Sequence, residues 1–275
     1  MIDMHIHTKN SDGEFTTEEI VKMIQKNNIT TFSITDHDNI KSCEEVEKIK
    51  IPKTITYIPG VEFSSKTDKY NCHILGYDIN YNNEQIINEC NIIRKRKIDK
   101  LKKLIKLIKE EYGIYITQEE EKEIFKKQGT IGRIDLCRLL IIKGYGTRRE
   151  IYDKYLSNLK DIETHRSNIE TITNIIKKSN GISILAHPKK IEKEYNVDIE
   201  NIIEEFIERG INGIEAYNSV HNLKDVKRYL LLAKKYNLLI TGGSDFHGII
   251  NHPERILGYT TKEKIRINSS NIKLH

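Results

Sequence analysis

The stretch Asp3-Met4-His5-Ile6-His7 opens the chain with the pattern of a short β-strand, in which apolar residues occupy alternate positions. Residues two apart on a strand point to the same side of the sheet. The two histidines can therefore reach one metal ion together, and the turn Ser11-Asp12-Gly13 adds a carboxylate. Taken alone, the histidine pair is better explained as surface chemistry. The interpretation as a metal site depends on similar signals further along the chain.

The composition limits the kind of protein that this chain can be. Its 275 residues suit one large domain or a barrel, and 45 Lys and Arg against 40 Asp and Glu give a net charge of +5. That mild excess favours a small anionic substrate over a long nucleic-acid duplex. Four cysteines without paired spacing, no signal-like N-terminus and no long apolar run predict a cytoplasmic protein without disulfides or a membrane partner.

Predicted strands and helices alternate along most of the chain. The seven strand candidates are apolar runs at residues 2–6, 31–35, 54–58, 71–79, 182–186, 213–217 and 238–241. Thr16-Thr17-Glu18-Glu19 has the pattern of a capping box, which marks the N-terminus of a helix. Only about eight residues separate Glu62 from the strand at 71–79, and a parallel crossover needs a dozen or more, so we expect a hairpin there.

The middle of the chain departs from this alternation. A long basic helix is predicted over residues 82–112, and helical segments continue to about residue 156 with breaks at 129–132 and 144–146. No convincing strand candidate interrupts them. We therefore predict an α/β domain formed by residues 1–80 and 165–275, with residues 81–164 inserted as a helical subdomain.

Polar side chains follow the last apolar residue of several predicted strands, as at His37, His187, Glu215, Asp245 and His247. In a parallel barrel those strand ends share one face, and active sites are built there. Residues from distant parts of the sequence are then expected to converge. The candidate metal ligands are His5, His7, Asp12, His37, Glu62, His73, His187, Asp245 and His247.

This candidate set contains imidazoles and carboxylates but no thiolate. Such donors suit borderline-to-hard transition ions, with manganese, iron and zinc as the candidates. The set is too large for one tetrahedral ion but fits two or three ions that share a bridging carboxylate. Metal ions that lie close together activate water and clamp a phosphoryl group, which is what phosphoester hydrolysis requires.

Simpler explanations exist for several of these residues when each is taken alone. His73 lies inside an alternating strand and suits a satisfied core histidine, whereas His187 before Pro188 suits a turn. Asp36 and Asp38 suit turn caps. Four further histidines have no convincing partner and are expected at the surface: His165, His221, His252 and His275. The joint pattern favours the metal site, because the other histidines fall at strand ends or in register.

Six groups of residues resemble the motifs of the PHP (polymerase and histidinol phosphatase) superfamily. They are His5-Ile6-His7 with Ser11-Asp12-Gly13, Thr35-Asp36-His37-Asp38, Gly60-Val61-Glu62, His73-Ile74-Leu75-Gly76, Ala186-His187-Pro188 and Gly243-Ser244-Asp245-Phe246-His247. Their order and spacing most resemble the stand-alone, TrpH-like phosphoesterases. Members of that branch include nucleoside 3',5'-bisphosphate phosphatases and 5'-to-3' exoribonucleases that act on short RNA.

The resemblance implies a distorted seven-stranded, TIM-like β/α barrel that binds two to three divalent ions, manganese foremost and iron or zinc as alternatives. It assigns one ion to His5, His7, Glu62 and Asp245, a second to Glu62, His73 and His187, and a third to Asp12, His37 and His247. A metal-bound hydroxide would attack phosphorus in line, so no side-chain nucleophile is expected. The implied partners are a small phosphorylated substrate and short single-stranded RNA, but neither duplex DNA nor a membrane.

The insert resembles the family less closely than the rest of the chain. Family members often carry Gly-Arg-Pro-His where this chain has Gly132-Arg133-Ile134-Asp135. A substrate with two phosphates needs cations that hold the phosphate that does not react, and arginine can grip it with two parallel hydrogen bonds. We expect the insert to act as a lid whose substrate-binding residues are Arg133 and one or two of Arg94, Arg96 and Lys97.

Three other functions compete with this interpretation. The first is a phosphatase of another small metabolite, such as histidinol phosphate. The second is a metal-dependent amidohydrolase, which also places His-x-His on the first barrel strand but commonly uses a carboxylated lysine that has no counterpart in this sequence. The third is a non-catalytic metal-binding module, which conflicts with a complete ligand set because a degenerate site should have lost ligands.

Overall fold

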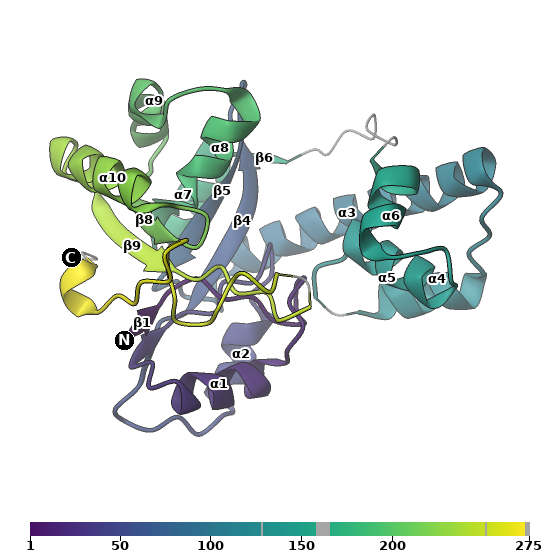
Figure 1. Ribbon diagram of the computed structural model, residues 1–275, viewed down its shortest axis with the longest axis horizontal. Helices are drawn as coiled ribbons and strands as arrows, with labels where there is room; N and C mark the ends of the chain where they lie inside the picture. The colour runs from purple at the N-terminus through teal and green to yellow at the C-terminus, as the bar shows by residue number, and fades with distance from the viewer. Residues whose placement is uncertain (128, 158–165, 251, 273–275) are drawn as a thin grey trace. The chain divides into compact units, whose positions relative to one another are not determined.

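The alternating strands and helices fold into an α/β unit, and the helical middle of the chain forms a second unit (Figure 1). The computed structural model describes residues 1–127, 129–157, 166–250 and 252–272. The first unit comprises Met1–Asn88 and Arg166–His275, and the second comprises Glu89–His165. The predicted C-terminal boundary of the insert, between 164 and 165, lies outside the described residues.

The first unit contains two β-sheets. The smaller sheet is parallel, in the order β1 (Ile2–Asp3), β2 (Thr31–Phe32) and β3 (Thr56–Tyr57). The larger sheet is mixed, in the order β6 (Ser167–Asn168), β4 (Gly60–Lys66), β5 (Asn71–Tyr77), β7 (Ile182–Leu185), β8 (Gly213–Asn218) and β9 (Leu239–Gly243). The chain therefore has an α/β fold with two sheets, where the sequence predicted one seven-stranded barrel.

The predicted hairpin is confirmed, because β4 pairs with β5 in antiparallel register from Gly60 opposite Tyr77 to Lys66 opposite Asn71. Strand β5 also runs antiparallel to β7. The start of β5 therefore lies at the sheet edge where β7 ends, and the amide of Ala186 donates to the His73 carbonyl across that edge (3.0 Å). Because β5 runs opposite to β7, His73 near the start of β5 lies at the same edge as the residues that follow the end of β7.

Backbone hydrogen bonds also connect the two sheets at both of their edges. On one side, the amide of Met4 donates to the carbonyl of Gly242 (3.1 Å), and that of His7 donates to the carbonyl of Phe246 (2.9 Å). On the other side, the Asp38 amide donates to the Glu62 carbonyl (2.8 Å). The ladder of β1 ends early because the amide of His5 bonds to the Asp3 carboxylate (3.3 Å). Individual backbone hydrogen bonds outside the regular ladders thus link the two sheets.

Amphipathic helices cover the sheets of the first unit. They are α1 (Thr17–Lys26), α2 (Lys41–Glu47), α7 (Ile169–Lys178), α8 (Pro188–Tyr195), α9 (Ile203–Glu208) and α10 (Leu223–Lys235), with 3-10 turns at Ile199–Asn201 and Ser269–Asn271. The predicted capping box is confirmed at Thr16 and Glu19. Figure 1 shows α10 beside β8, and α10 contacts both β8 and β9.

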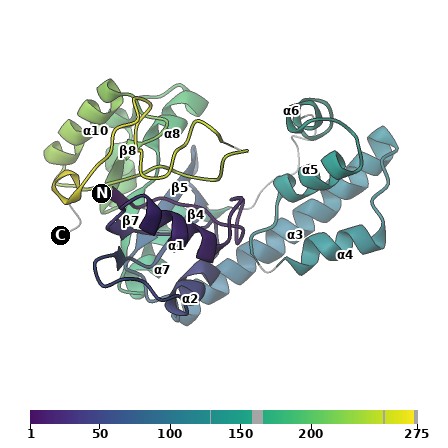
Figure 2. The same cartoon turned by 60° about the horizontal axis from the view of Figure 1, so that its bottom comes forward.

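All the described regular elements of the second unit are helices. Its elements are α3 (Glu84–Tyr112), which begins in the first unit, α4 (Gln118–Lys126), α5 (Arg133–Ile142), α6 (Arg148–Ile151) and a π-helical turn at Tyr152–Leu156 (Figure 2). Leu104 and Ile108 of α3 pack with Leu136 and Leu140 of α5 in a separate apolar core. None of the described helices combines the length and the apolar composition that a bilayer crossing requires.

Candidate metal centre

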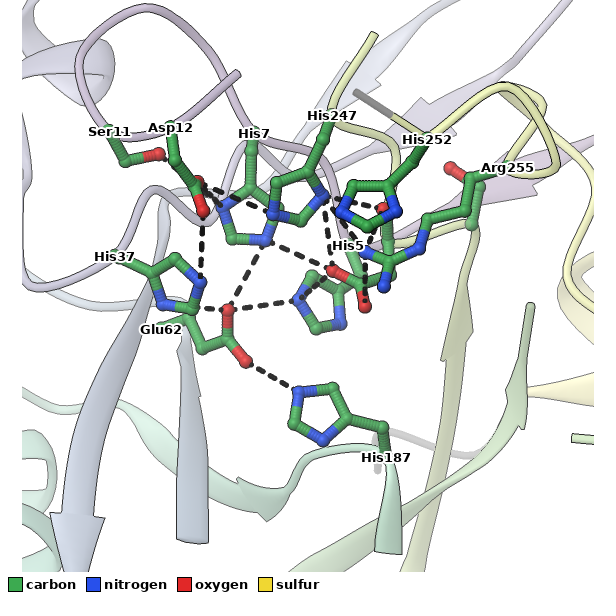
Figure 3. Close-up of polar contacts among 12 residues, drawn as sticks. His5, His7, Ser11, Asp12, His37, Glu62, His187, His247, His252 and Arg255 are labelled. Carbon is green, nitrogen blue, oxygen red and sulfur yellow. Dashed lines mark hydrogen bonds and ion pairs between the residues drawn. The ribbon is translucent and has the colours of Figure 1, made fainter. Parts of the chain in front are cut away.

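The nine predicted ligands gather at one edge of the sheets, and each has a nitrogen or carboxylate oxygen within 4 Å of another member of the set. Figure 3 labels all of them except His73 and Asp245. Three overlapping groups have donor atoms that all lie within 4.8 Å of one another. These groups are His5, His7, Glu62 and Asp245; His7, Asp12, His37 and His247; and His37, Glu62 and His73. The sequence separation of these residues shows that the fold, not local chain geometry, brings them together.

The first group has the spacing of ligands around a single ion. Nε2 of His5 and Nε2 of His7 each lie 3.2 Å from Oε2 of Glu62, and they lie 3.4 and 3.3 Å from Oδ1 of Asp245. Four ligands at about 2.1 Å from a tetrahedral ion stand about 3.4 Å apart. The two histidine nitrogens and this Glu62 oxygen are buried without a hydrogen-bond partner among the described residues. Buried polar atoms rarely remain so unless an ion or water completes them, so these residues fit a metal.

Glu62 lies at the centre because its two oxygens face different histidines. Oε1 is 2.9 Å from Nδ1 of His73 and 2.9 Å from Nε2 of His187. Oε2 faces the first group and also lies 3.1 Å from Nδ1 of His37. A fully buried carboxylate with donors on both sides has the position of a bridge between two ions.

The third set of predicted ligands surrounds Asp12. Oδ1 of Asp12 is 3.3 Å from Nε2 of His247, and Oδ2 is 3.9 Å from Nε2 of His37. The ring of His247 stacks on that of His7 with centroids 4.0 Å apart, which joins this group to the first. Asp12 is the most exposed of these four residues, with a third of its side chain open to solvent.

The structure groups the predicted ligands in a slightly different way from the expected sets. His7 belongs to the Asp12 group as well as to the first group, and His37 lies with Glu62 and His73. His187, which was expected with Glu62 and His73, still contacts Oε1 of Glu62. The half-buried His73 is a contact of Glu62 rather than a residue of the apolar core.

Two site residues adopt backbone conformations that L-amino acids seldom occupy. His187 has φ 26° and Asp245 has φ 54°, both in the left-handed region. Each such conformation costs on the order of 1–3 kcal/mol and persists where the surroundings determine it. Gly243 permits the approach of β9 to β1, because a Cβ there would stand 2.3 Å from that of His5. The fold therefore accepts local strain in order to aim these side chains.

Glu215 supports the ligands from behind. Its Oε1 lies 2.8 Å from Nδ1 of His5, and its Oε2 accepts hydrogen bonds from the His187 amide (2.7 Å) and from Nδ2 of Asn218 (2.9 Å). A carboxylate can only accept, so Nδ1 of His5 carries the proton and Nε2 is left for a ligand. The sequence placed Glu215 at a strand end but gave no means of assigning this supporting role.

Two cations that the sequence analysis missed hold the outer oxygen of Asp245. Nη1 of Arg255 lies 2.9 Å and Nζ of Lys190 lies 3.1 Å from Oδ2 of Asp245. Arg255 also donates to the Asp245 carbonyl (2.9 Å), and its Nη1 is 3.1 Å from Nδ1 of His247. Arg255 lies beyond the last strand in irregular chain, where no periodic pattern marks it. The sequence signal available for Lys190 was its position one helical turn after His187, a candidate ligand.

The carboxylates of the site are held in their charged form. Burial opposes ionisation, yet neighbouring imidazoles and, for Asp245, Lys190 and Arg255 hold the pKa values of Asp12, Glu62 and Asp245 well below their usual range. A buried concentration of negative charge attracts cations. Together with the unpaired imidazole nitrogens, this charge favours a divalent ion.

The histidines separate into two classes of basicity. Burial disfavours protonation of His5 and His7, but the adjacent carboxylates outweigh it, raising the pKa of His5 well above its usual value and that of His7 to about 9. Burial lowers the pKa of His37 and of His187 to about 3, so both are neutral. The two basic histidines are those surrounded by the carboxylates of the first group.

Asp36 and Asp38, which the simpler explanation made turn caps, accept hydrogen bonds from residues far away in the sequence. Asp36 accepts hydrogen bonds from the amide and hydroxyl of Thr8 (both 2.7 Å) and from the hydroxyl of Ser11 (2.5 Å). Asp38 accepts from the amide (2.7 Å) and hydroxyl (2.9 Å) of Ser64. These bonds fix the loops that carry Asp12 and His37.

The expected surface position of His221 is wrong. This histidine is fully buried, and its Nδ1 lies 2.9 Å from the Ala216 carbonyl, with its ring packed against Tyr229. Its partners could not be inferred from the sequence pattern, because the contacts come from the end of β8 and from α10. His252 is partly exposed, lies 3.0 Å from Glu254 and has its ring 5.4 Å from that of His247. His165 and His275 lie outside the described residues.

The cations predicted to bind substrate lie in the second unit. Arg94 uses its guanidinium on three backbone carbonyls, with Nη1 donating to Gly129 (2.7 Å) and Nη2 to Phe125 (3.1 Å) and Lys127 (2.7 Å). Those contacts give Arg94 a structural task at the end of α4. Arg96 is exposed and Lys97 is half-buried, whereas Arg133 begins α5 and is half-buried.

Comparison with known proteins finds a family match over most of the chain. The model described as PHP domain matches residues 3–215. A 3',5'-nucleoside bisphosphate phosphatase from Chromobacterium violaceum is 25% identical over 249 residues, which are 90% of this chain and 87% of that protein. The 5'-3' exoribonuclease Rnm of Escherichia coli is 25% identical over 89% of this chain and 84% of its own length.

Other relatives and solved structures agree with this match. A phosphoribosyl 1,2-cyclic phosphate 1,2-diphosphodiesterase from Eggerthella lenta is 24% identical over 90% of this chain and 94% of its own. A structure from C. violaceum, described as an amidohydrolase with bound sulfate, superposes with a TM-score of 0.76 at 25% identity, covering 90% of this chain and 87% of its own. A candidate metal-dependent phosphoesterase from Bifidobacterium adolescentis shares the fold, with a TM-score of 0.77 at 22% identity over 99% and 92% of the two chains.

Proposed function

The chain belongs to the PHP domain family, and on that premise we propose that it is a metal-dependent phosphoesterase acting on a small phosphorylated nucleotide. A nucleoside 3',5'-bisphosphate is the first candidate substrate and short 5'-phosphorylated RNA is the second, since relatives bear the names of both activities. The observation that carries the proposal is the position of Glu62, whose two buried oxygens face separate sets of histidines.

The donor set supports two to three divalent ions. His5, His7, Glu62 and Asp245 would hold one ion, Glu62 with His73 and His187 a second, and Asp12 with His37 and His247 a third. Manganese is the first candidate, with iron and zinc as alternatives, because the donors are nitrogen and oxygen without sulfur. When bound, such ions supply an activated water and neutralise the charge of the phosphoryl oxygens.

The chain's own residues prepare that chemistry by fixing positions and charges. Glu215 sets the tautomer of His5 so that Nε2 faces Glu62. Arg255 fixes the outer oxygen of Asp245 and leaves Oδ1 toward the two histidines. Side chains that are already positioned in this way need not reorganise during the reaction. Such preorganisation is a main source of rate enhancement in polar sites.

We also propose that seven strands close into the distorted barrel that the family resemblance implies. The hydrogen bonds that join β1 to β9 and β2 to β4 support this closure, because they link both edges of the two sheets. The order around the barrel would be β1, β2, β4, β5, β7, β8 and β9. The short strands β3 and β6 would then be outer additions.

A substrate panel tests the proposed function. The manganese-loaded chain is assayed for phosphate or nucleotide release from a nucleoside 3',5'-bisphosphate, from short 5'-phosphorylated RNA and from histidinol phosphate. We expect turnover of the bisphosphate or the RNA, loss of turnover on chelation and recovery when manganese is restored. Hydrolysis of histidinol phosphate alone would indicate that the substrate is another small metabolite and not a nucleotide. If the loaded chain hydrolyses no phosphoester, the proposal is refuted.

An amidohydrolase is the second candidate because one similar structure carries that description. The position of Glu62 argues against it, since a glutamate occupies the bridging place that a carboxylated lysine commonly takes in amidohydrolases. Lys190 approaches Asp245 from a helix and keeps an ammonium contact with that carboxylate. Turnover of amide or lactam substrates in the absence of phosphoester turnover would favour this second candidate.

A further inference from the structure

We propose that Lys190 binds the phosphate group of the substrate at this metal centre, an inference that rests on the proposed function. Lys190 is on the first turn of α8, two residues after Pro188 and three after His187. Its Nζ lies 3.1 Å from Oδ2 of Asp245, the oxygen that points away from His5 and His7. The ammonium group therefore lies at the border of the candidate metal site.

Two cations share this one carboxylate oxygen, and they differ in what else they do. Arg255 is nine-tenths buried and makes contacts with Oδ2 and the carbonyl of Asp245 and with His247. Among the residues that the structure describes, the Lys190 ammonium forms an ion pair with Oδ2 of Asp245 alone, and 38% of its side chain is exposed. If Lys190 leaves, Arg255 still contacts Oδ2 and the carbonyl of Asp245, so the buried carboxylate keeps a cation beside it.

The chemistry of lysine suits a contact that changes during binding. Its ammonium is a compact point charge on a flexible four-carbon stem, and it binds phosphate without the planar fork that fixes arginine. An ion bound to Oδ1 of Asp245 would draw charge from that carboxylate and weaken its hold on Lys190. A phosphoryl oxygen arriving at the same edge would then compete for the ammonium of this partly exposed side chain.

The neighbouring Lys189 provides a matched control within the same helical turn. Its Nζ lies 2.8 Å from Oδ1 of Asp225 and 3.2 Å from Oε2 of Glu192, and both of these carboxylates are buried. Lys189 thus pairs with α10 and with its own helix rather than with a candidate metal ligand. The two lysines are adjacent in sequence and identical in charge, so they separate a local effect on phosphate from a general loss of charge.

The experiment compares Lys190→Gln, Lys190→Arg and Lys189→Gln with the parent chain, all loaded with manganese. Calorimetry measures the affinity for inorganic phosphate, elemental analysis measures bound manganese, and kinetics give KM and kcat for the nucleotide. Loss of one charge-assisted hydrogen bond should weaken phosphate binding by Lys190→Gln about tenfold or more, with the manganese content unchanged. Lys190→Arg should recover most of that affinity, and Lys189→Gln should retain it.

Three outcomes would overturn the inference. Phosphate affinity of Lys190→Gln within about twofold of the parent would show no contact. An equal loss in Lys189→Gln would show a general charge effect. A loss of manganese in Lys190→Gln that accounts for the weaker phosphate binding would make Lys190 a positioning residue for Asp245. A parent chain that hydrolyses no phosphoester yet binds phosphate through Lys190 would refute the proposed function and leave this inference standing.

Discussion

Nδ1 of His5 and Oε1 of Glu215 are 2.8 Å apart, and both side chains are fully buried. The pair joins the segment that follows β1 to strand β8, across 210 positions of sequence. Since the carboxylate accepts the Nδ1 proton, Nε2 is the nitrogen that faces Glu62 and Asp245 and that a metal would bind after displacing any proton there. Glu215 therefore decides whether His5 can act as a ligand.

The first prediction is that Glu215→Gln weakens metal binding without removing a ligand. The glutamine carbonyl can still accept from His5, but its NH2 group would face the His187 amide. In the parent chain that amide donates to Oε2 of Glu215. Substitution of such supporting carboxylates typically costs about 10–100-fold in metal affinity. Titration of the metal-stripped chain with manganese measures the effect. Glu205→Gln on α9, a partly exposed residue that pairs with Arg209, is the control, and equal affinity in both variants would remove Glu215 from the account.

The second prediction is that Glu62→Gln is among the most damaging single substitutions. It takes a negative charge from a position that faces five histidines, so more than one ion should be affected. Substitution of a supporting residue typically lowers metal affinity or activity by about 10–100-fold, and we expect Glu62→Gln to lower kcat by more than that. Steady-state kinetics and elemental analysis of the same preparation check it. Near-normal turnover with a full metal complement would show that Glu62 bridges nothing.

The third prediction concerns Arg133 and the expected role of the insert as a lid. Replacing Arg133 by Ala should raise KM for a nucleoside bisphosphate about tenfold or more, because a hydrogen bond to a charged group contributes about 1.5–3 kcal/mol. An aryl phosphate, which lacks the second phosphate, should be much less affected. Arg149→Ala on α6, where the side chain is almost fully exposed, is the matched control. Equal losses on both substrates would place Arg133 at the reacting phosphate or in the fold.

The fourth prediction is that manganese affinity rises with pH. In the metal-free chain the pKa of His7 is raised to about 9 and that of His5 is also raised, so both carry protons at neutral pH. A metal must displace these protons, and its apparent affinity should increase from pH 6 to about pH 9 and then level. Binding titrations at fixed ionic strength measure this slope. An affinity that is flat across the range would show that the two imidazoles are already neutral.

Much of the candidate site could be predicted because its residues have local signals. Histidines two apart on a strand, and polar residues that follow apolar runs, are visible in sequence, and the structure brings the nine together. The hairpin of β4 and β5 followed from loop length alone. The reversal of β5 then places His73 near Glu62, a contact that its position inside a strand could not reveal.

Several supporting contacts could not be predicted because they join segments that share no periodic pattern. Arg255 lies in irregular chain beyond β9, and its guanidinium contacts Asp245 from there. His221 has no apolar pattern around it, yet the turn after β8 buries it. The family resemblance implied a single barrel, whereas the regular strand pairing is divided between two sheets. Such features depend on side-chain to backbone bonds that alternation does not encode.

The most direct test of the central claim is the number of metal equivalents that full activity requires. The metal-stripped chain is titrated with manganese while phosphate release from a nucleoside 3',5'-bisphosphate and bound metal are measured in the same samples. Because the three donor groups overlap in pairs through His7, His37 and Glu62, activity should continue to rise beyond one equivalent and reach its plateau at two to three. A plateau at one equivalent, or full activity in the metal-free chain, would contradict the account.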